Sequence, residues 1–192
     1  MRWAVPVRLE GRHVVLEPLS RDHAEDLAVA AGDLSGLWYT AIPTPEGVPA
    51  EIERRLGLLE TGSMVPFAQV AGGRAVGMTT YMNVDHANRR LEIGSTWLSP
   101  DVQRTPVNTE AKRLLLGHAF EALGAIAVEF RTHHLNRQSR AAIERLGAKL
   151  DGILRSHQVM PNGTLRDTAV YSITAAEWPA VRAGLDFRLE RR

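Results

Sequence analysis

The sequence predicts an α+β protein built on about seven β-strands, and three observations support this fold class. Apolar residues alternate with polar or small ones at a period of two over residues 126–131, which is typical of a half-buried strand. Other segments place apolar residues three and four positions apart, as one face of a helix requires. An Asn-Gly pair at 162–163 separates two apolar runs and indicates a β-hairpin.

The N-terminal third is expected to contain one strand and two helices. Residues 13–16 are rich in β-formers, and Pro18 ends that run. Ser20 is a suitable N-cap for a helix over 21–31, which Gly32 terminates. A second helix is predicted over 50–60, ending before Gly62, with an i,i+4 pair between Glu51 and Arg55 and an apolar stripe of Ile52, Leu56 and Leu59.

Three consecutive strands are predicted in the middle of the chain. They cover residues 65–70, 75–83 and 91–98, and the first two are joined by the Gly-Gly turn at 71–74. A polar loop at 85–88 joins the second strand to the third. Short connections of this kind place sequential strands antiparallel.

A helix is predicted over about 109–123, and it follows a polar loop. Asn108 is a good N-cap, Glu110 adds negative charge to the first turn, and Gly124 follows as a stop. The predicted buried stripe is Ala111, Leu115, Ala119 and Ala122. A loop that feeds a helix N-terminus presents unpaired N–H groups, so this one is either an anion site or an ordinary strand–helix connection.

The C-terminal third continues with a strand, a helix and a hairpin. Ile126, Val128 and Phe130 alternate with polar or small residues and predict a strand. A fourth helix opens at 136–140 and stops at Gly147, with Ile143 and Leu146 inside. Strands over 150–159 and 165–173 form the hairpin, and Thr174 with Glu177 forms a capping box for a last helix near 175–185. The whole is expected to be one domain, 1–192.

Composition narrows the class of protein. The net charge of +1 gives no basis for nucleic-acid or membrane binding, and the chain has no cysteine for disulfide, thiolate or cysteine-zinc chemistry. The first residues lack the apolar region of a signal peptide, so we expect a cytoplasmic protein. A homodimer is plausible, although no stretch of the sequence points to one.

Several motifs, in order and spacing, resemble the GNAT N-acetyltransferases, and most closely their RimJ/RimL-like branch. The run LEGRHVVLEPL at 9–19 is similar to the opening strand of that branch, and EIGSTWL at 92–98 to its fourth strand. NRQS at 136–139 and LGA at 146–148 are similar to a later motif. The resemblance implies a twisted, mostly antiparallel mixed sheet with helices on both faces, in which strands four and five splay apart.

The resemblance also implies an acetyl-CoA site. Backbone groups of Trp97 and Leu98 would pair with the pantetheine arm in the gap between the splayed strands. The loop at 103–108 (QRTPVN) would wrap the pyrophosphate, yet proline and asparagine stand at 106 and 108, where the family usually has glycine and glycine or alanine. We interpret the site as altered rather than lost, with contacts from Gln103, Arg104, Thr105, Val107, Asn108 and Thr109.

The helix that opens at 136 supplies further expected cofactor contacts. The resemblance implies that Asn136 bonds the pantetheine or adjoining backbone and that Ser139 and Arg140 face the thiol and phosphate end. The alternative for Asn136 and Ser139 is simple helix capping.

Amide formation requires a base for the amine, and Glu92 is the candidate because many family members use an acid on this strand. The alternative is an exposed carboxylate paired with Arg89 or Arg90. Many relatives use a tyrosine as general acid at a position that is Ile143 here. Ser139 or water could serve instead, and Tyr171 is more consistent with a core residue.

The acceptor amine would lie near Trp38, Tyr39 and His157. Trp38 and Tyr39 either plug the core under a loop or line a substrate mouth. His157, on the penultimate strand, is either a substrate contact or a structural residue. The adjacent His133 and His134 face opposite sides of a strand, so no metal is expected.

The sequence therefore predicts a cytoplasmic acetyl-CoA-dependent N-acetyltransferase that acts on a protein N-terminus or a small amine. A non-catalytic acyl-CoA-binding or partner-binding domain is the alternative.

Overall fold

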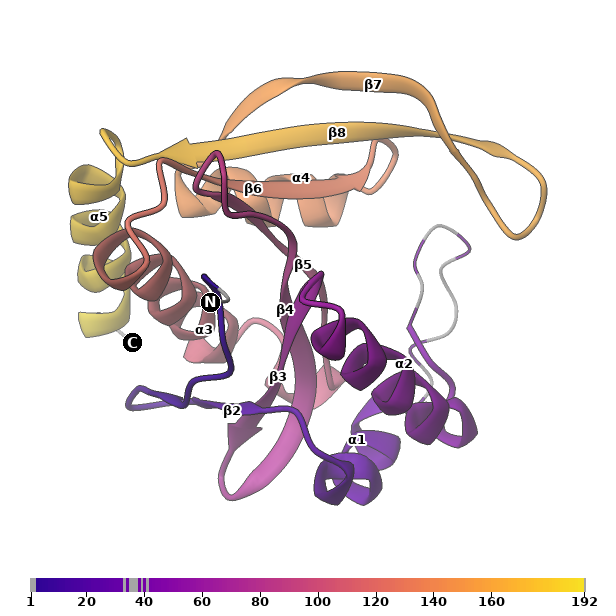
Figure 1. Ribbon diagram of the computed structural model, residues 1–192. Coiled ribbons are helices and arrows are strands. Elements are labelled where there is room, and N and C mark those ends of the chain that lie inside the picture. Colours follow the sequence, from indigo (N-terminus) through magenta and orange to yellow (C-terminus); the bar gives the residue numbers. More distant parts are fainter. Residues whose placement is uncertain (1–2, 33, 35–37, 39, 41, 192) are drawn as a thin grey trace.

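The described part of the chain forms one eight-stranded sheet in the order β1-β2-β3-β4-β5-β6-β8-β7 (Figure 1). The computed structural model describes residues 3–32, 34, 38, 40 and 42–191. The strands are β1 (Leu9–Glu10), β2 (Val15–Pro18), β3 (Met64–Ala71), β4 (Arg74–Asp85), β5 (Arg90–Leu98), β6 (Ala127–His133), β7 (Lys149–Val159) and β8 (Leu165–Thr174). The pairings are antiparallel except for β5 with β6.

The predicted mixed, mostly antiparallel sheet is confirmed, with one strand more than expected. The additional strand is β1, a two-residue segment that pairs Leu9 with Leu16. The first predicted strand begins two residues later than expected and includes Pro18, which pairs with Phe67 at the strand end. Proline is tolerated there because a strand terminus does not need its N–H.

Helices cover both faces of the sheet. The helices are α1 (Ala24–Ala31), α2 (Val48–Glu60), α3 (Pro106–Gly117), α4 (Arg137–Leu146) and α5 (Trp178–Glu190), with a π-helix, η5 (His118–Ala122), directly after α3 and short 3₁₀ turns at Arg21–His23, Pro45–Gly47 and Pro100–Val102. Helices α1 and α2 pack on β3 and β4, as Figure 1 shows, whereas α3 and α5 contact one another.

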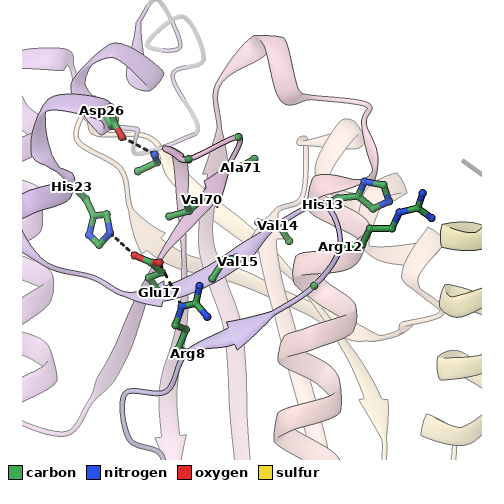
Figure 2. A pocket seen from close by; sticks show the side chains of 14 residues that line it. Arg8, Arg12, His13, Val14, Val15, Glu17, His23, Asp26, Val70 and Ala71 are labelled. Atoms are coloured by element: carbon green, nitrogen blue, oxygen red, sulfur yellow. Dashed lines mark hydrogen bonds and ion pairs between the residues drawn. The ribbon is translucent and has the colours of Figure 1, made fainter.

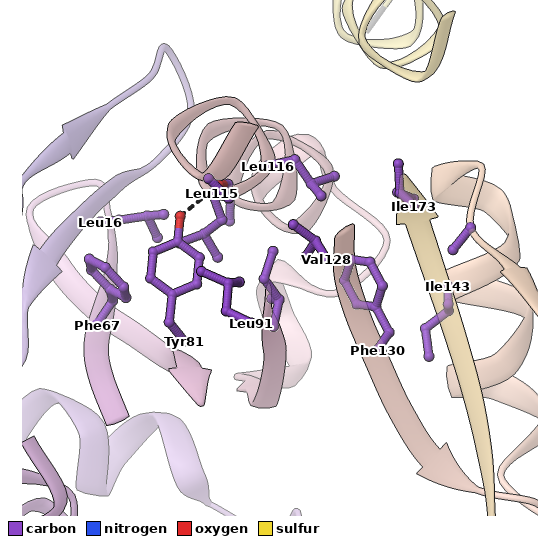
Figure 3. Packing of buried hydrophobic residues seen from close by; sticks show 14 of the residues in the cluster. Leu16, Phe67, Tyr81, Leu91, Leu115, Leu116, Val128, Phe130, Ile143 and Ile173 are labelled. Carbon is purple, nitrogen blue, oxygen red and sulfur yellow. Dashed lines mark hydrogen bonds between the residues drawn. The ribbon is translucent and has the colours of Figure 1, made fainter. Parts of the chain in front are cut away.

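Strand alternation separates two hydrophobic cores. On β3, Phe67 belongs to the large cluster that includes α3, and its neighbour Ala68 belongs to the cluster beneath α1 and α2. Figure 3 shows part of the large cluster, where the hydroxyl of buried Tyr81 donates to the carbonyl of Leu115 at 2.6 Å. The alternation of side chains along a β-strand therefore distributes the apolar residues of β3 between two layers.

The predicted stripe of the central helix is right for three of its four residues. Ala111, Leu115 and Ala119 are fully buried, but Ala122 is exposed. The last turn is a π-helix, and the extra residue in each hydrogen-bonded ring moves Ala122 off the buried face. The terminal helix also differs from prediction, because it runs from Trp178 to Glu190 rather than over 175–185.

No helix among the described ranges has both the length and the hydropathy that a bilayer crossing requires.

Candidate active site

Strands β5 and β6 part after a short parallel contact. Only three residues of each strand are in register, from Arg90 with Ala127 to Glu92 with Glu129. Beyond Glu92, β5 continues along β4 to Leu98, while β6 continues along β8 to His133. The splay that the resemblance implied is therefore present, and it begins at Glu92.

A β-bulge distorts β5 just beyond this point. Between two pairings with β4, Thr80 with Gly94 and Met78 with Trp97, β5 contains one residue more than its partner. Ser95 has a left-handed φ of 46°, which is rare for a residue with a side chain. Bulges re-aim the backbone and side chains of a strand, so the segment beside the split does not have regular strand geometry.

A buried arginine from α2 holds one side of the bulge. The Arg55 side chain is 1% exposed; it donates to Glu51 and Thr80 at 2.7 Å each and to the Ser95 carbonyl at 3.2 Å. The predicted Glu51–Arg55 pair is thus confirmed, but it is not a surface pair. Together with the bonds from Arg55 to Thr80 and Ser95, it forms a clamp that holds α2 against β4 and β5.

A buried lysine from α3 holds the other side of the bulge. The Lys112 ammonium donates to Thr79 at 3.0 Å and to Thr96 at 2.6 Å, and these two hydroxyls lie 2.8 Å apart. Burial lowers the pKa of Lys112 to about 7, because no carboxylate among the described residues pairs with it. The bulged segment is therefore fixed from both faces of the sheet by basic side chains.

The loop after β5 leads directly into α3, one turn earlier than predicted. The N-cap is Thr105, whose hydroxyl accepts the Val107 N–H at 3.4 Å, and Pro106 is the first helical residue. The prediction that Asn108 caps the helix is wrong. Proline fits the first helical position because its fixed φ is helical and its missing N–H would have no partner there.

The loop still has the features of an anion site. Arg104 adopts a left-handed φ of 64°, so the conformation expected at a glycine occurs at this arginine instead. Because Pro106 has no N–H and Thr105 caps Val107, Asn108 supplies the remaining first-turn amide. The Oδ1 atom of Asn108 is buried and has no hydrogen-bond partner among the described residues. The loop therefore offers an amide donor for an acidic group and the Asn108 Oδ1 acceptor for an N–H or hydroxyl group. An acyl-CoA carries both kinds of group.

Glu110 does not act in the first turn of the helix as predicted. Its carboxylate is buried and accepts the backbone N–H groups of Arg12, His13 and Val14 at 3.0, 2.6 and 2.9 Å. A Cβ on Gly11 would lie 2.5 Å from this carboxylate, so glycine is required there. Glu110 thus ties α3 to the β1–β2 hairpin.

The remaining predicted cofactor contacts on β5 lie beside the loop. The Trp97 side chain packs in the cluster under α1 and α2, and its carbonyl accepts from Gln69 Nε2 at 3.4 Å, so a cofactor contact at Trp97 stays a prediction. The Leu98 carbonyl accepts from Gln103 Nε2 at 3.0 Å. Thr109 follows Asn108 in the first turns of α3 and is half-buried.

Glu92 lies where the two strands separate, and it is not the exposed carboxylate of the alternative interpretation. It is 5% exposed, accepts from Asn83 Nδ2 at 2.7 Å, and has Arg131 rather than Arg89 or Arg90 as its ion-pair partner at 3.5 Å. Burial raises the pKa of Glu92, and the hydrogen bond from Asn83 and the charge of Arg131 oppose this effect. A buried carboxylate with a raised pKa is suited to general-base chemistry.

Gly94 makes room for this carboxylate. A Cβ at Gly94 would lie 2.8 Å from Glu92 Oε1 and 2.7 Å from Met82 Sδ. Any larger residue would displace the Glu92 side chain from its position, which explains glycine in the EIGS run.

Helix α4 begins close to the end of β6. Asn136 caps it by accepting the Ser139 N–H at 3.0 Å, so the capping alternative is present, and contact with a cofactor stays a prediction for both residues. Arg140 donates to the Tyr171 hydroxyl at 2.8 Å and lies 3.3 Å from His134 Nδ1. Tyr171 is fully buried and donates to Glu144, which confirms it as a core residue.

The predicted acceptor residues are partly brought together. Trp38 is 52% exposed and packs edge-on against the ring of His133, with centroids 5.3 Å apart, so it is not a core plug. His157 is exposed and lies 3.0 Å from Thr168 Oγ1, which faces His133 across the β6–β8 pairing. Tyr39 lies outside the described residues. Within the described part of the chain, His, Asp and Glu side chains form no group that could hold a metal.

A hollow of about 430 Å³ lies elsewhere, between the β1–β2 and β3–β4 hairpins. Figure 2 shows Glu17 there between His23, at 3.3 Å, and Arg8, at 3.6 Å. None of the predicted site residues lines this hollow.

Sequence reasoning missed Lys112, the function of Arg55, and Arg166 on β8. Lys112 carried one signal, since Leu115 and Leu116, three and four residues further along the helix, are apolar. The contacts of Arg55 and Lys112 are with strands far away in sequence, and the half-burial of Arg166 depends on the pairing of β8, which a local pattern does not reveal.

Comparisons with known proteins agree with this geometry. A family model described as "Acetyltransferase (GNAT) domain" matches residues 13–149. The Bacillus subtilis (strain 168) protein YdaF, named as a candidate ribosomal N-acetyltransferase, is 34% identical over 106 residues, which are 55% of this chain and 57% of that protein. The chain thus matches little more than half the length of this curated relative.

Solved structures give longer matches. The crystal structure of a candidate acetyltransferase from T. thermophilus has 38% identity, covers 97% of this chain and 99% of that one, and has a TM-score of 0.85. Mycobacterium smegmatis RimJ in complex with CoA-disulfide has 25% identity, 96% and 93% coverage, and a TM-score of 0.79.

The fold that contains this split and the helix N-terminus is shared with these solved acetyltransferase structures. The chain belongs to the GNAT acetyltransferase family, and its relatives place it in the RimJ/RimL-like branch. The resemblance seen in the sequence is thereby confirmed.

Proposed function

We propose that the protein is an acetyl-CoA-dependent N-acetyltransferase that transfers acetyl directly to a primary amine in a ternary complex. The observation that carries this proposal is the buried carboxylate of Glu92 at the point where β5 and β6 part. It lies on the strand that leads into the anion-binding loop before α3, so a base and a cofactor site share one strand.

The cofactor would lie in the split, with its pyrophosphate at residues 103–109 and its thioester near Glu92. Acetyl-CoA supplies the activated acyl group. The loop offers a helix N-terminus, the Asn108 amide and the Arg104 side chain for the phosphates. The relative RimJ was solved with CoA-disulfide, which supports a CoA-derived co-substrate.

Glu92 would accept the proton of the acceptor amine, directly or through one water, as the nitrogen attacks the thioester carbonyl. A backbone N–H of the bulged segment beside Ser95 would stabilise the developing oxyanion. The departing thiolate requires little assistance, and Ser139 is the candidate to protonate it. The acceptor is a protein N-terminus or a small amine; the name of YdaF, a candidate ribosomal N-acetyltransferase, favours the former.

Steady-state release of CoA thiol with a panel of amines tests this proposal. We expect Glu92→Gln to lower turnover by about 10²- to 10⁴-fold, the usual range for a general base. Acetyl-CoA affinity, measured by calorimetry, should be retained. Glu129→Gln is the matched control, because Glu129 is the register partner of Glu92 on β6 and is held by Arg90 and Arg131.

A non-catalytic acyl-CoA-binding domain is the second candidate, and two observations favour it. Pro106 replaces a family glycine, and Ile143 occupies the position of the family tyrosine. Acetyl-CoA binding without thiol release by any amine would support this candidate and contradict the enzyme.

A further inference from the structure

The β6–β8 half of the sheet carries a polar face that continues from Glu92. Glu129, Arg131 and His133 alternate along β6 and so project to one face, and Glu129 is the register partner of Glu92. On β8, Thr168 is the partner of His133. Arg166 lies two residues before Thr168 and therefore shares this face.

The carboxylates on this face already have partners. Glu129 is bound by Arg90 and Arg131, with Arg131 at 2.8 Å. Glu92 accepts from Asn83 and also lies 3.5 Å from Arg131. The two other carboxylates in this region, Asp151 and Asp167, bond Ser172 at 3.0 Å and Arg155 at 2.7 Å.

Arg166 differs from the other arginines of this region. Its Nε atom donates to Thr168 Oγ1 at 3.0 Å, and no carboxylate of the described chain lies within ion-pair distance of its guanidinium. The same hydroxyl lies 3.0 Å from His157 Nδ1. Thr168 thus orients the guanidinium through Nε and leaves its two terminal nitrogens to other partners.

Burial makes this unpaired charge significant. Arg166 is half-buried, and burial lowers its pKa, although the negative charge of Glu92 opposes this change. Burying a charge is costly without a counter-ion, and a guanidinium is well suited to bind carboxylate or phosphate through two parallel hydrogen bonds. Glu92 and Arg166 are close enough for each charge to affect the other's protonation.

We propose that Arg166 binds an anionic group of the acceptor, so that the preferred substrate is a primary amine with a carboxylate or phosphate attached. The amine lies at Glu92, and the anion lies at the terminal nitrogens of Arg166, beside His133 and Trp38. This inference rests on the proposed function, because it deepens the description of the acceptor site of the same reaction.

Matched acceptors test the inference. One series consists of ω-amino carboxylates of increasing chain length, each compared with its uncharged ω-amino amide; a parallel series of ω-amino phosphonates separates phosphate from carboxylate recognition. In the native protein, kcat/KM should favour at least one anionic acceptor by about tenfold or more over its neutral partner, as expected for a charge-assisted hydrogen bond.

In Arg166→Gln, the ratio of the two kcat/KM values should fall to about one. Arg155→Gln is the matched control, since Arg155 lies on the neighbouring strand β7, is 81% exposed and bonds Asp167. It should retain the native ratio. A native ratio near one at every chain length, or a ratio that Arg166→Gln does not change, would overturn the inference while leaving the proposed function intact.

A binding measurement decides the case in which no amine is acetylated. The N-acetylated ω-amino carboxylates of each chain length are titrated calorimetrically into the native protein in the presence of CoA. If the native protein and Arg155→Gln bind one of these compounds and Arg166→Gln does not, the anion site is supported even if the proposed function fails. Absence of binding in the native protein contradicts the anion site.

Discussion

At the scale of single residues, Glu92 combines a chemical function with an unfavourable environment. Its pKa is raised chiefly by burial, so the ionised form that a base requires is the form that the site penalises. Because its folded-state pKa lies above the unfolded value, the free energy of unfolding falls as pH rises from the unfolded pKa to the folded one.

Two measurements on Glu92 follow. The kcat/KM of the native enzyme should rise with pH along a limb whose pKa is higher than that of an ordinary glutamate, and Glu92→Gln should lose that limb. At neutral pH, Glu92→Gln should unfold at no lower temperature than the native protein, because the amide removes a penalised charge. A strongly destabilised variant, or an unchanged pH profile, would argue for a structural role.

Lys112 gives a pH dependence of the opposite kind. Its folded-state pKa of about 7 lies below the unfolded value, so the unfolded chain binds the extra proton between pH 7 and about 10. The native protein should therefore gain stability as pH rises through this window, by up to about 1.4 kcal/mol per pH unit.

Chemical denaturation at a series of pH values checks this prediction. The difference in the free energy of unfolding between the native protein and Lys112→Met should show the slope, because all other titrating groups cancel. A flat difference between pH 7 and about 9 would show that the amine keeps an ordinary pKa.

The sequence identified Glu92 as a candidate base, but it could not predict the environment of that side chain. The EIGS run placed an acid on the right strand, whereas its burial depends on Met82, Asn83 and Arg131 from neighbouring strands. Lys112 and Arg166 were missed because sequence patterns assign charged residues to the surface. Their burial depends on the strands that pack around them.

At the scale of elements, the start of α3 explains how the proline is accommodated. Pro106 occupies the first helical position, and the left-handed turn occurs two residues earlier, at Arg104. The predicted N-cap was wrong because Asn108 and Thr105 are both good capping residues, and proline at the following position favours Thr105.

The cap can be tested by substitution. Thr105→Ala should lower the free energy of unfolding by about 1 kcal/mol and weaken acetyl-CoA binding, because the capping hydroxyl also fixes the loop. Thr105→Ser, which retains the hydroxyl, should restore both quantities. Denaturation and calorimetry provide the readouts, and loss of stability without loss of affinity would exclude the loop from the cofactor site.

The clamp between α2 and β5 is the second element-scale feature. Arg55→Met would leave the Thr80 hydroxyl and the Ser95 carbonyl without their partner, whereas Glu51 would keep Arg54, so we expect a loss of about 1–3 kcal/mol. Glu51→Gln should cost less in the Arg55→Met background than in the native protein, because Glu51 has already lost its buried partner there. Two additive losses would show that the pair does not act as a unit.

At the scale of the whole molecule, the sheet order brings the site together. Local periodicity predicted most helices and strands, since each is a stretch with its own apolar face. The parting of β5 and β6 was expected only from the family resemblance, because strand order depends on contacts between Glu92 and Glu129, 37 residues apart in sequence. The polar face that contains Arg166 depends on the β6–β8 pairing and could not be predicted from local sequence.

The central claim is that acetyl-CoA lies between the parted strands with its phosphates at the start of α3. Amide hydrogen exchange with and without saturating acetyl-CoA tests it most directly. The account predicts slower exchange confined mainly to residues 93–98 and 104–109. Protection at the hollow between the β1–β2 and β3–β4 hairpins instead, or no protection at any segment, would contradict it.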